Sequence, residues 1–132
     1  GSGEIKNLTD LCYNVLEPCR AKFDKPIRIS SGYRSEELCV AIGSKKTSQH
    51  ALGMAVDMEI PSESNLKVAL WIQNNCDFDQ LILEYYTGEA NSGWIHVSFN
   101  EGNNRKQVLT FDGKSYTNGL PDAKWSGGKL QN

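Results

Sequence analysis

The two histidines of the chain, His50 and His96, are the residues with the clearest chemistry. His50 and Asp57 are seven residues apart in "SQHALGMAVD", and His96 follows much later in "WIHVSF". Gly53 lies between the first two and allows the chain to turn, so that His50 can reach back toward Asp57. Imidazole nitrogens and carboxylate oxygens are the usual ligands of catalytic zinc, which keeps a further position open for water. A fold that brings the three side chains together would create such a site.

Alternation of apolar and polar residues assigns Asp57 and His96 to the faces of their strands that point away from the core. In "MAVDMEI", residues 54–60, apolar side chains occupy every second position and Asp57 falls between them. In "GWIHVSF", residues 93–99, the alternate apolar positions likewise leave His96 on the opposite face. We therefore expect both side chains to point away from the core.

A β-hairpin is predicted where "FDQLILEYY" and "GWIHVSFN" flank a glycine-rich loop. One permissible register has Glu84 opposite His96 and Tyr86 opposite Trp94, with residues 87–93 as the loop. In that register a carboxylate and an imidazole become cross-strand neighbours. Glu84 is then expected beside the candidate metal site.

The same residues also permit a purely structural interpretation. His50 could cap a loop, His96 could bond to neighbouring backbone, and Asp57 could cap an element or pair with an arginine. The spacing between His50 and Asp57 has no strict geometry until a turn is assigned at Gly53. The residue pattern alone leaves both interpretations open.

Three helices and several short strands are expected to position these residues. An amphipathic helix from about Leu8 to Phe23 contains Pro18, which should kink or shorten it because proline lacks a backbone donor. A short helix follows from its Ser35 cap to Gly43, and a third begins near Pro61 and Ser62 in "SESNLKVALWIQNNC". Strands are predicted in "KPIRISS", "MAVDMEI", "FDQLILEYY", "GWIHVSFN" and "QVLTF", and in "KSYT" beyond a turn at Asp112 and Gly113.

The order of these elements predicts an α+β fold with a small central, mostly antiparallel sheet and flanking helices. A length of 132 residues corresponds to one domain. We expect a cloning remnant at residues 1–3, the domain at residues 4–118 and a loosely ordered tail at residues 119–132.

Composition argues against several classes of partner. The net charge of −2, from 14 basic and 16 acidic residues, provides no broad positive field for nucleic acid. Lys45 and Lys46 form the one dense basic pair and are expected in a solvated loop. No long apolar run predicts a membrane span. We therefore expect that the chain contacts neither nucleic acid nor membrane, and we also expect a monomer.

The four cysteines are expected to be free thiols rather than a disulfide framework. Cys12 and Cys19 fall on the apolar face of the first helix, Cys39 lies in the second, and Cys76 ends the third. A domain of this length does not need disulfides, and free cysteine packs as a small hydrophobic residue.

The motifs "IRISSGYRS", "SQHALGMAVD" and "WIHVSF", in this order, resemble those of the M15 family of zinc D-alanyl-D-alanine carboxypeptidases and endopeptidases, in its compact, phage-type branch. The resemblance extends from about Asn7 to Tyr116. It implies a hedgehog/DD-peptidase-like fold, one Zn²⁺ per chain, and hydrolysis of an amide bond in peptidoglycan stem peptides at the bacterial cell wall. The bond could be of the D-Ala-D-Ala or the L-Ala-D-Glu type. A non-catalytic metal- or peptide-binding module on the same fold is the alternative.

The resemblance also implies roles for individual residues. His50, Asp57 and His96 match the three zinc ligands of the family. Arg34 in "SGYRS" matches an arginine that holds substrate or steadies the developing oxyanion, a task suited to a guanidinium group. Ser48 matches a serine that contacts substrate. Their structural alternatives are a salt bridge for Arg34 and an ordinary loop hydroxyl for Ser48.

The general base is the point at which the sequence departs from better-known M15 members. Those members have a glutamate three residues before the final histidine, where this chain has Gly93. We expect Glu84 to be the base, in preference to Glu89 in the loop and Glu59 on the strand of Asp57. The alternative role for Glu84 is to orient His96.

Two aromatic residues complete the set of predicted site residues. Trp94 and Tyr86 are expected to form an apolar wall of the substrate cleft, because the hairpin register assigns them to the face of His96. Packing alone is the alternative role for both.

Overall fold

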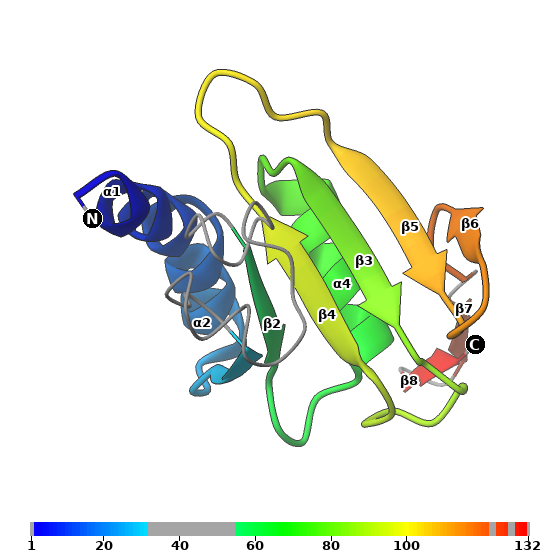
Figure 1. Cartoon of the computed structure of the whole chain (residues 1–132). Coiled ribbons are helices and arrows are strands. Elements are labelled where there is room, and N and C mark those ends of the chain that lie inside the picture. Colours follow the sequence, from blue (N-terminus) through cyan, green and yellow to red (C-terminus); the bar gives the residue numbers. More distant parts are fainter. Residues whose placement is uncertain (1, 32–54, 122–123, 127–128, 132) are drawn as a thin grey trace.

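The computed structural model describes residues 2–31, 55–121, 124–126 and 129–131 (Figure 1). The predicted second helix and the loop that contains His50 therefore lie outside the described residues. The elements are α1 (Ser2–Leu11), the π-helical turn η1 (Cys12–Leu16), α2 (Glu17–Phe23), β1 (Arg28–Ser31), β2 (Ala55–Glu59), α4 (Asn65–Asn75), β3 (Gln80–Glu84), β4 (Trp94–Ser98), β5 (Gln107–Phe111), β6 (Tyr116–Asn118), β7 (Lys124–Ser126) and β8 (Lys129–Gln131).

A mixed sheet of six strands in the order β1-β2-β4-β3-β5-β6 forms the centre of the fold. The pairs β1·β2, β2·β4, β3·β4 and β5·β6 are antiparallel, and β3 runs parallel to β5. The predicted α+β class and the mostly antiparallel sheet are confirmed. In the segment expected to be a loose tail, β7 and β8 pair as a separate two-stranded sheet.

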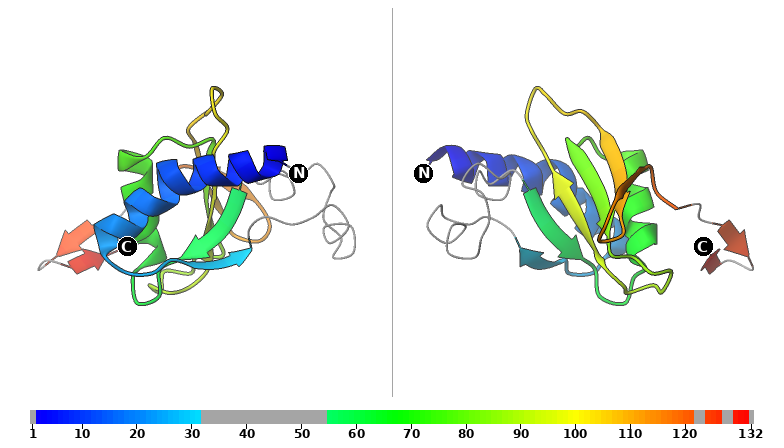
Figure 2. Two further views of the ribbon diagram at one scale, coloured as in Figure 1. Left: turned by 90° about the vertical axis from the view of Figure 1, so that its left-hand side faces the viewer. Right: turned by 45° about the vertical axis from the view of Figure 1, so that its right-hand side comes forward.

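The described helices α2 and α4 pack on one face of the sheet. Helices α2 and α4 lie on the same side of the strands (Figure 2, left). Helical and strand side chains pack there into a single core cluster; its strand members are Val56, Met58, Leu81, Leu83, Ile95 and Val97. These residues are the alternate positions that the sequence pattern assigned to the core. The intervening side chains, including Asp57 and His96, project to the opposite face.

The N-terminal helix continues through Pro18 with a change in its winding. The proline lies in the first turn of α2, directly after the π-helical turn. A proline ring clashes with the carbonyl four residues earlier, and Asn14, at that distance, belongs to the widened turn. The expected local distortion thus occurs, but the helix ends only at Phe23, before Asp24 in a left-handed conformation at φ 53°.

Helix α4 begins later than predicted, at Asn65. Ser64 is its N-cap and accepts a hydrogen bond from the backbone N–H of Lys67 at 3.3 Å. Ser62 has a φ of 71°, so it lies in the turn that leads into the helix. The sequence offers both serines, and the turn geometry selects the second one.

Three of the cysteines lie in the described residues and are free thiols, as predicted. Cys19 and Cys76 are buried and Cys12 is partly buried. Burial raises the pKa of Cys19 to about 12 and that of Cys76 to about 11. Both thiols are therefore protonated at neutral pH and act as core side chains. Cys39 lies outside the described residues.

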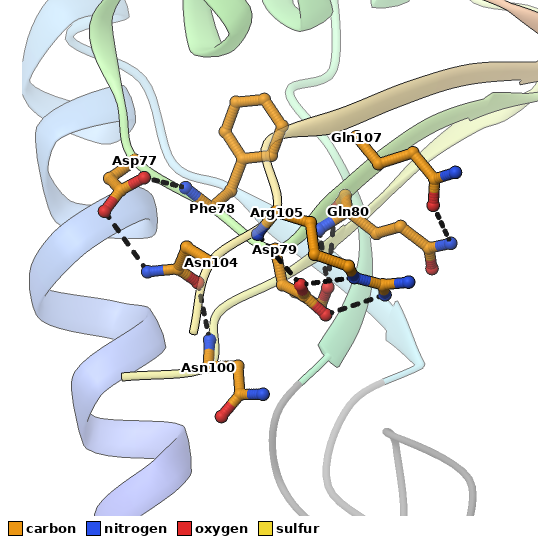
Figure 3. Close-up of polar contacts among 9 residues, drawn as sticks. Asp77, Phe78, Asp79, Gln80, Asn100, Asn104, Arg105 and Gln107 are labelled. Atoms are coloured by element: carbon orange, nitrogen blue, oxygen red, sulfur yellow. Dashed lines mark hydrogen bonds and ion pairs between the residues drawn. The ribbon is translucent and has the colours of Figure 1, made fainter. Parts of the chain in front are cut away.

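A polar network fixes the connection from β4 to β5 beneath the start of β3 (Figure 3). Arg105 donates from Nε and Nη2 to the two carboxylate oxygens of the buried Asp79, at 2.8 and 2.9 Å. Asn104 accepts from the backbone N–H of Asn100 at 2.7 Å and donates to Asp77 at 3.2 Å. Bidentate arginine–carboxylate pairs are strong and directional. The network therefore holds β5 in its parallel register with β3, at the opposite end of β3 from Glu84.

No helix among the described residues has both the length and the apolar character that crossing a membrane requires.

Candidate active site

Five of the predicted site residues lie in the described part of the chain, and the structure brings four of them to one region of the sheet. Asp57 comes from β2, Glu84 from β3, and Trp94 and His96 from β4. The fifth, Tyr86, follows β3 in the hairpin loop. His50, Ser48 and Arg34 lie outside the described residues, so their predicted roles stay predictions.

Asp57 and His96 are directly opposite each other on adjacent antiparallel strands. The Nδ1 atom of His96 lies 3.2 Å from Oδ1 of Asp57. Both side chains are largely shielded from solvent, with 13% of His96 and 19% of Asp57 exposed. Pairing of β2 with β4 therefore brings an imidazole nitrogen and a carboxylate oxygen close to each other.

The spacing of these two atoms suits two ligands of one zinc ion. Tetrahedral geometry with ordinary Zn–N and Zn–O lengths puts neighbouring ligand atoms about 3.4 Å apart. A charge-assisted N–H···O hydrogen bond is shorter, at about 2.8 Å. The observed 3.2 Å lies between these two values and within the ordinary range of an N–H···O hydrogen bond, so it accommodates either arrangement. Within the described segments, no three His, Cys, Asp or Glu side chains group as a metal site, so a third protein ligand would have to come from elsewhere, as predicted for His50.

Glu84 lies next to this pair, but the predicted hairpin register was wrong by two residues. Its partner on β4 is Trp94, and the residue opposite His96 is Ile82. Because a shift of two preserves the alternation of faces, Glu84 still projects on the same side of the sheet as His96. The Nε1–H of Trp94 donates to Oε2 of Glu84 at 2.5 Å, which fixes the carboxylate.

The electrostatic environment of Glu84 reflects this position. Burial, followed by the negative charge of Asp57, raises the pKa of the Glu84 carboxyl group. His96 and the hydrogen bond from Trp94 act in the opposite direction. Two carboxylates that share a partly buried region repel each other, and a cation bound between them would relieve this repulsion. The site is therefore electrostatically suited to a divalent metal ion.

Tyr86 has contacts that match packing, the alternative role that the sequence left open for it. It packs against the core cluster, and its hydroxyl donates to the carbonyl of Gly88 at 3.3 Å. The neighbouring Tyr85, rather than Tyr86, contacts Trp94, with its ring centroid 5.0 Å from that of Trp94. The backbone of Tyr85 is left-handed at φ 60°, which breaks the strand alternation from which the Tyr86 prediction was made.

Gly93 ends the hairpin loop in a conformation that excludes a side chain. Its φ is +67°, and a Cβ atom there would overlap the carbonyl oxygen of Glu84 and come within 2.8 Å of the Tyr85 carbonyl carbon. Asn65 of α4 holds the same loop by donating from Nδ2 to the carbonyls of Ser92 and Gly93, at 2.9 and 3.1 Å. The position that carries a glutamate in better-known M15 members thus accepts only glycine here.

Substitution of Gly93 should therefore be costly to stability. We expect Gly93→Ala to lower the free energy of unfolding by about 3 kcal/mol, because a left-handed backbone and a backbone overlap are combined. Gly102→Ala is the matched control, since Gly102 has a φ of +78° but nothing within 4 Å of its added Cβ. It should cost only about 1 kcal/mol. Urea denaturation measures both values, and equal losses would contradict the overlap at Gly93.

The two other carboxylates that the sequence offered as a base have different surroundings. Glu59 accepts a hydrogen bond from Arg28 at 2.6 Å, so its charge is compensated by that ion pair. Glu89 is exposed in the hairpin loop, where its backbone contacts Ser92. Of Glu59, Glu84 and Glu89, Glu84 is the one that lies beside the Asp57–His96 pair, where a general base for this site would have to be.

Comparison with known families finds a match that covers most of the chain. The profile of the family described as Peptidase M15 matches residues 3–98, which includes Asp57, Glu84 and His96. No curated protein sequence matches the chain.

Proposed function

The chain belongs to the M15 peptidase family, and we propose that it is a zinc-dependent peptidase that hydrolyses an amide bond in peptidoglycan stem peptides. Family membership makes it a hydrolase of the metallopeptidase kind. The observation that carries the zinc proposal is the 3.2 Å approach of His96 Nδ1 to Asp57 Oδ1 beside a second carboxylate. We also propose the hedgehog/DD-peptidase-like fold and the compact, phage-type branch, for which the α+β sheet and the order of the motifs are the support.

Asp57 and His96, together with the predicted ligand His50, would hold the metal. Bound zinc supplies a Lewis acid that polarises the scissile carbonyl and lowers the pKa of the attacking water. Arg34 and Ser48 are proposed to orient the carboxylate or carbonyl groups of the substrate. These assignments follow the family motifs residue by residue.

Glu84 is proposed as the general base. Its carboxylate projects from the strand next to that of His96, and Trp94 holds one of its oxygens at 2.5 Å. Glu84 would accept a proton from the attacking water and return it to the leaving amine. The conformation of Gly93 supports this assignment, because it leaves no room for an acidic side chain at the usual position.

The direct test is cleavage of purified muropeptides by the intact chain. We expect release of new amino termini or of D-alanine, loss of that activity after treatment with 1,10-phenanthroline, and recovery when Zn²⁺ is restored. Mass spectrometry of the products identifies the bond that is cut. Zinc-loaded protein that binds muropeptides without cleaving them would instead support a non-catalytic binding module, the alternative that Gly93 at the usual base position suggests.

A further inference from the structure

A row of aromatic side chains extends from the candidate site to the edge of the sheet. Strands β4, β3, β5 and β6 are neighbours in that order (Figure 1). Trp94 is paired with Glu84, Glu84 with Phe111, and Phe111 with Tyr116, so these residues form one line across four strands. Registered partners project on the same face of a sheet. The line is therefore on the face of Asp57 and His96, two residues away along the strands.

Tyr85 joins the row and makes it continuous. Its ring centroid lies 5.0 Å from that of Trp94 and 5.5 Å from that of Phe111, and Phe111 stacks on Tyr116 at 4.4 Å. We call Trp94, Tyr85, Phe111 and Tyr116 the aromatic row.

The two tyrosines of the row are exposed, and Trp94 and Phe111 are partly buried. Tyr85 is 46% and Tyr116 58% exposed, although the core lies on the other face of the same strands. Tyr85 also adopts a left-handed backbone conformation, which a tyrosine rarely does. Gly113 leaves room for the Tyr85 ring, because a Cβ atom there would come within 3.0 Å of that ring. Contiguous exposed aromatic surface next to a site is typical of ligand binding.

The chemistry of the row favours a neutral, polyhydroxylated ligand. The four side chains of the row are aromatic rather than basic, and Glu84, which is paired with Trp94 and Phe111, is acidic, whereas the carboxylates of a stem peptide would require cations. Aromatic faces are electron-rich and attract polarised C–H groups, and the tyrosine hydroxyls can bond to hydroxyl groups. A sugar ring presents C–H groups on its face and hydroxyl groups at its rim. A saccharide matches this surface better than a charged peptide does.

We propose that the aromatic row is a glycan subsite that binds the N-acetylhexosamine strand to which the stem peptide is attached. This inference rests on the proposed function, because the glycan and the scissile peptide belong to one substrate. Glu84 links the two regions, since it is paired with Trp94 and Phe111 and lies beside the Asp57–His96 pair. The row is thus continuous with the catalytic region and would hold the glycan while the peptide enters it.

The test compares one stem peptide with and without its disaccharide. We expect Tyr116→Ala to lower kcat/KM about tenfold on the disaccharide-linked peptide, in line with the loss of one aromatic contact, and to change it less than twofold on the free peptide. Tyr116→Phe should retain most of the activity because it keeps the ring. Tyr13→Ala is the control, since Tyr13 is 78% exposed on the N-terminal helix. Equal losses on both substrates would assign the row to the peptide and overturn the proposal.

Direct binding separates this proposal from the proposed function. Titration of wild-type protein with an N-acetylglucosamine tetramer should perturb its tryptophan fluorescence, and Tyr116→Ala should weaken binding about tenfold. A wild type that cleaves neither substrate but binds the tetramer through Tyr116 would refute the peptidase function and retain the glycan subsite. Absence of tetramer binding, or binding that Tyr116→Ala leaves unchanged, would refute the subsite.

Discussion

Glu84→Gln should lower kcat for muropeptide cleavage about a thousandfold while leaving KM within a few-fold of the wild-type value. The amide has nearly the same shape as the carboxylate, and its oxygen can still accept the hydrogen bond from Trp94 Nε1. It cannot accept a proton from water at neutral pH. The loss should therefore fall on the chemical step, and single-turnover kinetics on a purified muropeptide would measure it.

The matched control is Glu89→Gln, which makes the same chemical change in the exposed hairpin loop and should retain full activity. Zinc content must be measured in both variants, because a loss of metal from Glu84→Gln would indicate a ligand or positioning role instead. Unchanged kcat in a zinc-loaded Glu84→Gln variant would refute the base assignment. Activity lost through KM alone would also refute it and would assign Glu84 to substrate binding.

The positions of Asp57 and His96 on the face away from the core could be predicted, because apolar and polar residues alternate cleanly in both strands. Val56 and Met58 on one strand, and Ile95 and Val97 on the other, are all buried as the pattern requires. A period of two assigns each side chain to a face without any knowledge of the neighbouring strand. That information was enough to bring two proposed ligands to one surface.

The alternation of apolar and polar residues could not determine the register of the hairpin. Shifting Glu84 from opposite His96 to opposite Trp94 changes no residue's face, so the apolar pattern fits both registers equally well. The difference arises in the loop, where Tyr85 and Gly93 both adopt positive φ values. Glycine signals such a conformation in a sequence, but tyrosine does not.

Long-range polar contacts were equally hidden. Asn65 opens a helix, where asparagine is unremarkable, yet its buried side chain holds the carbonyls of Ser92 and Gly93 across the hairpin loop. Arg105 and Asp79 form their bidentate pair across 26 residues without a motif that relates them. Such partners are brought together by the tertiary fold. Local sequence patterns therefore could not predict the contacts of Asn65 with the hairpin loop or the pair of Arg105 and Asp79.

Removal of either described candidate ligand should abolish zinc binding. We expect wild-type protein to contain about one zinc ion per chain, and Asp57→Asn and His96→Ala to lose it on dialysis. Even partners that only orient a ligand cost ten- to a hundredfold in metal affinity when removed, so loss of the ligand itself should exceed about a hundredfold. Elemental analysis of the purified proteins, with competition by a zinc-binding dye, measures both stoichiometry and affinity.

Glu59→Gln is the control that separates ligation from general loss of negative charge. Glu59 lies on the same strand as Asp57, two residues further along, and pairs with Arg28 at 2.6 Å. Its removal changes the net charge as much as Asp57→Asn does, so both variants weaken nonspecific attraction of a cation equally. Retention of zinc by Glu59→Gln together with loss from Asp57→Asn would identify Asp57 as a ligand. Retention of zinc by folded His96→Ala would instead mean that the 3.2 Å approach of His96 to Asp57 is a structural ion pair.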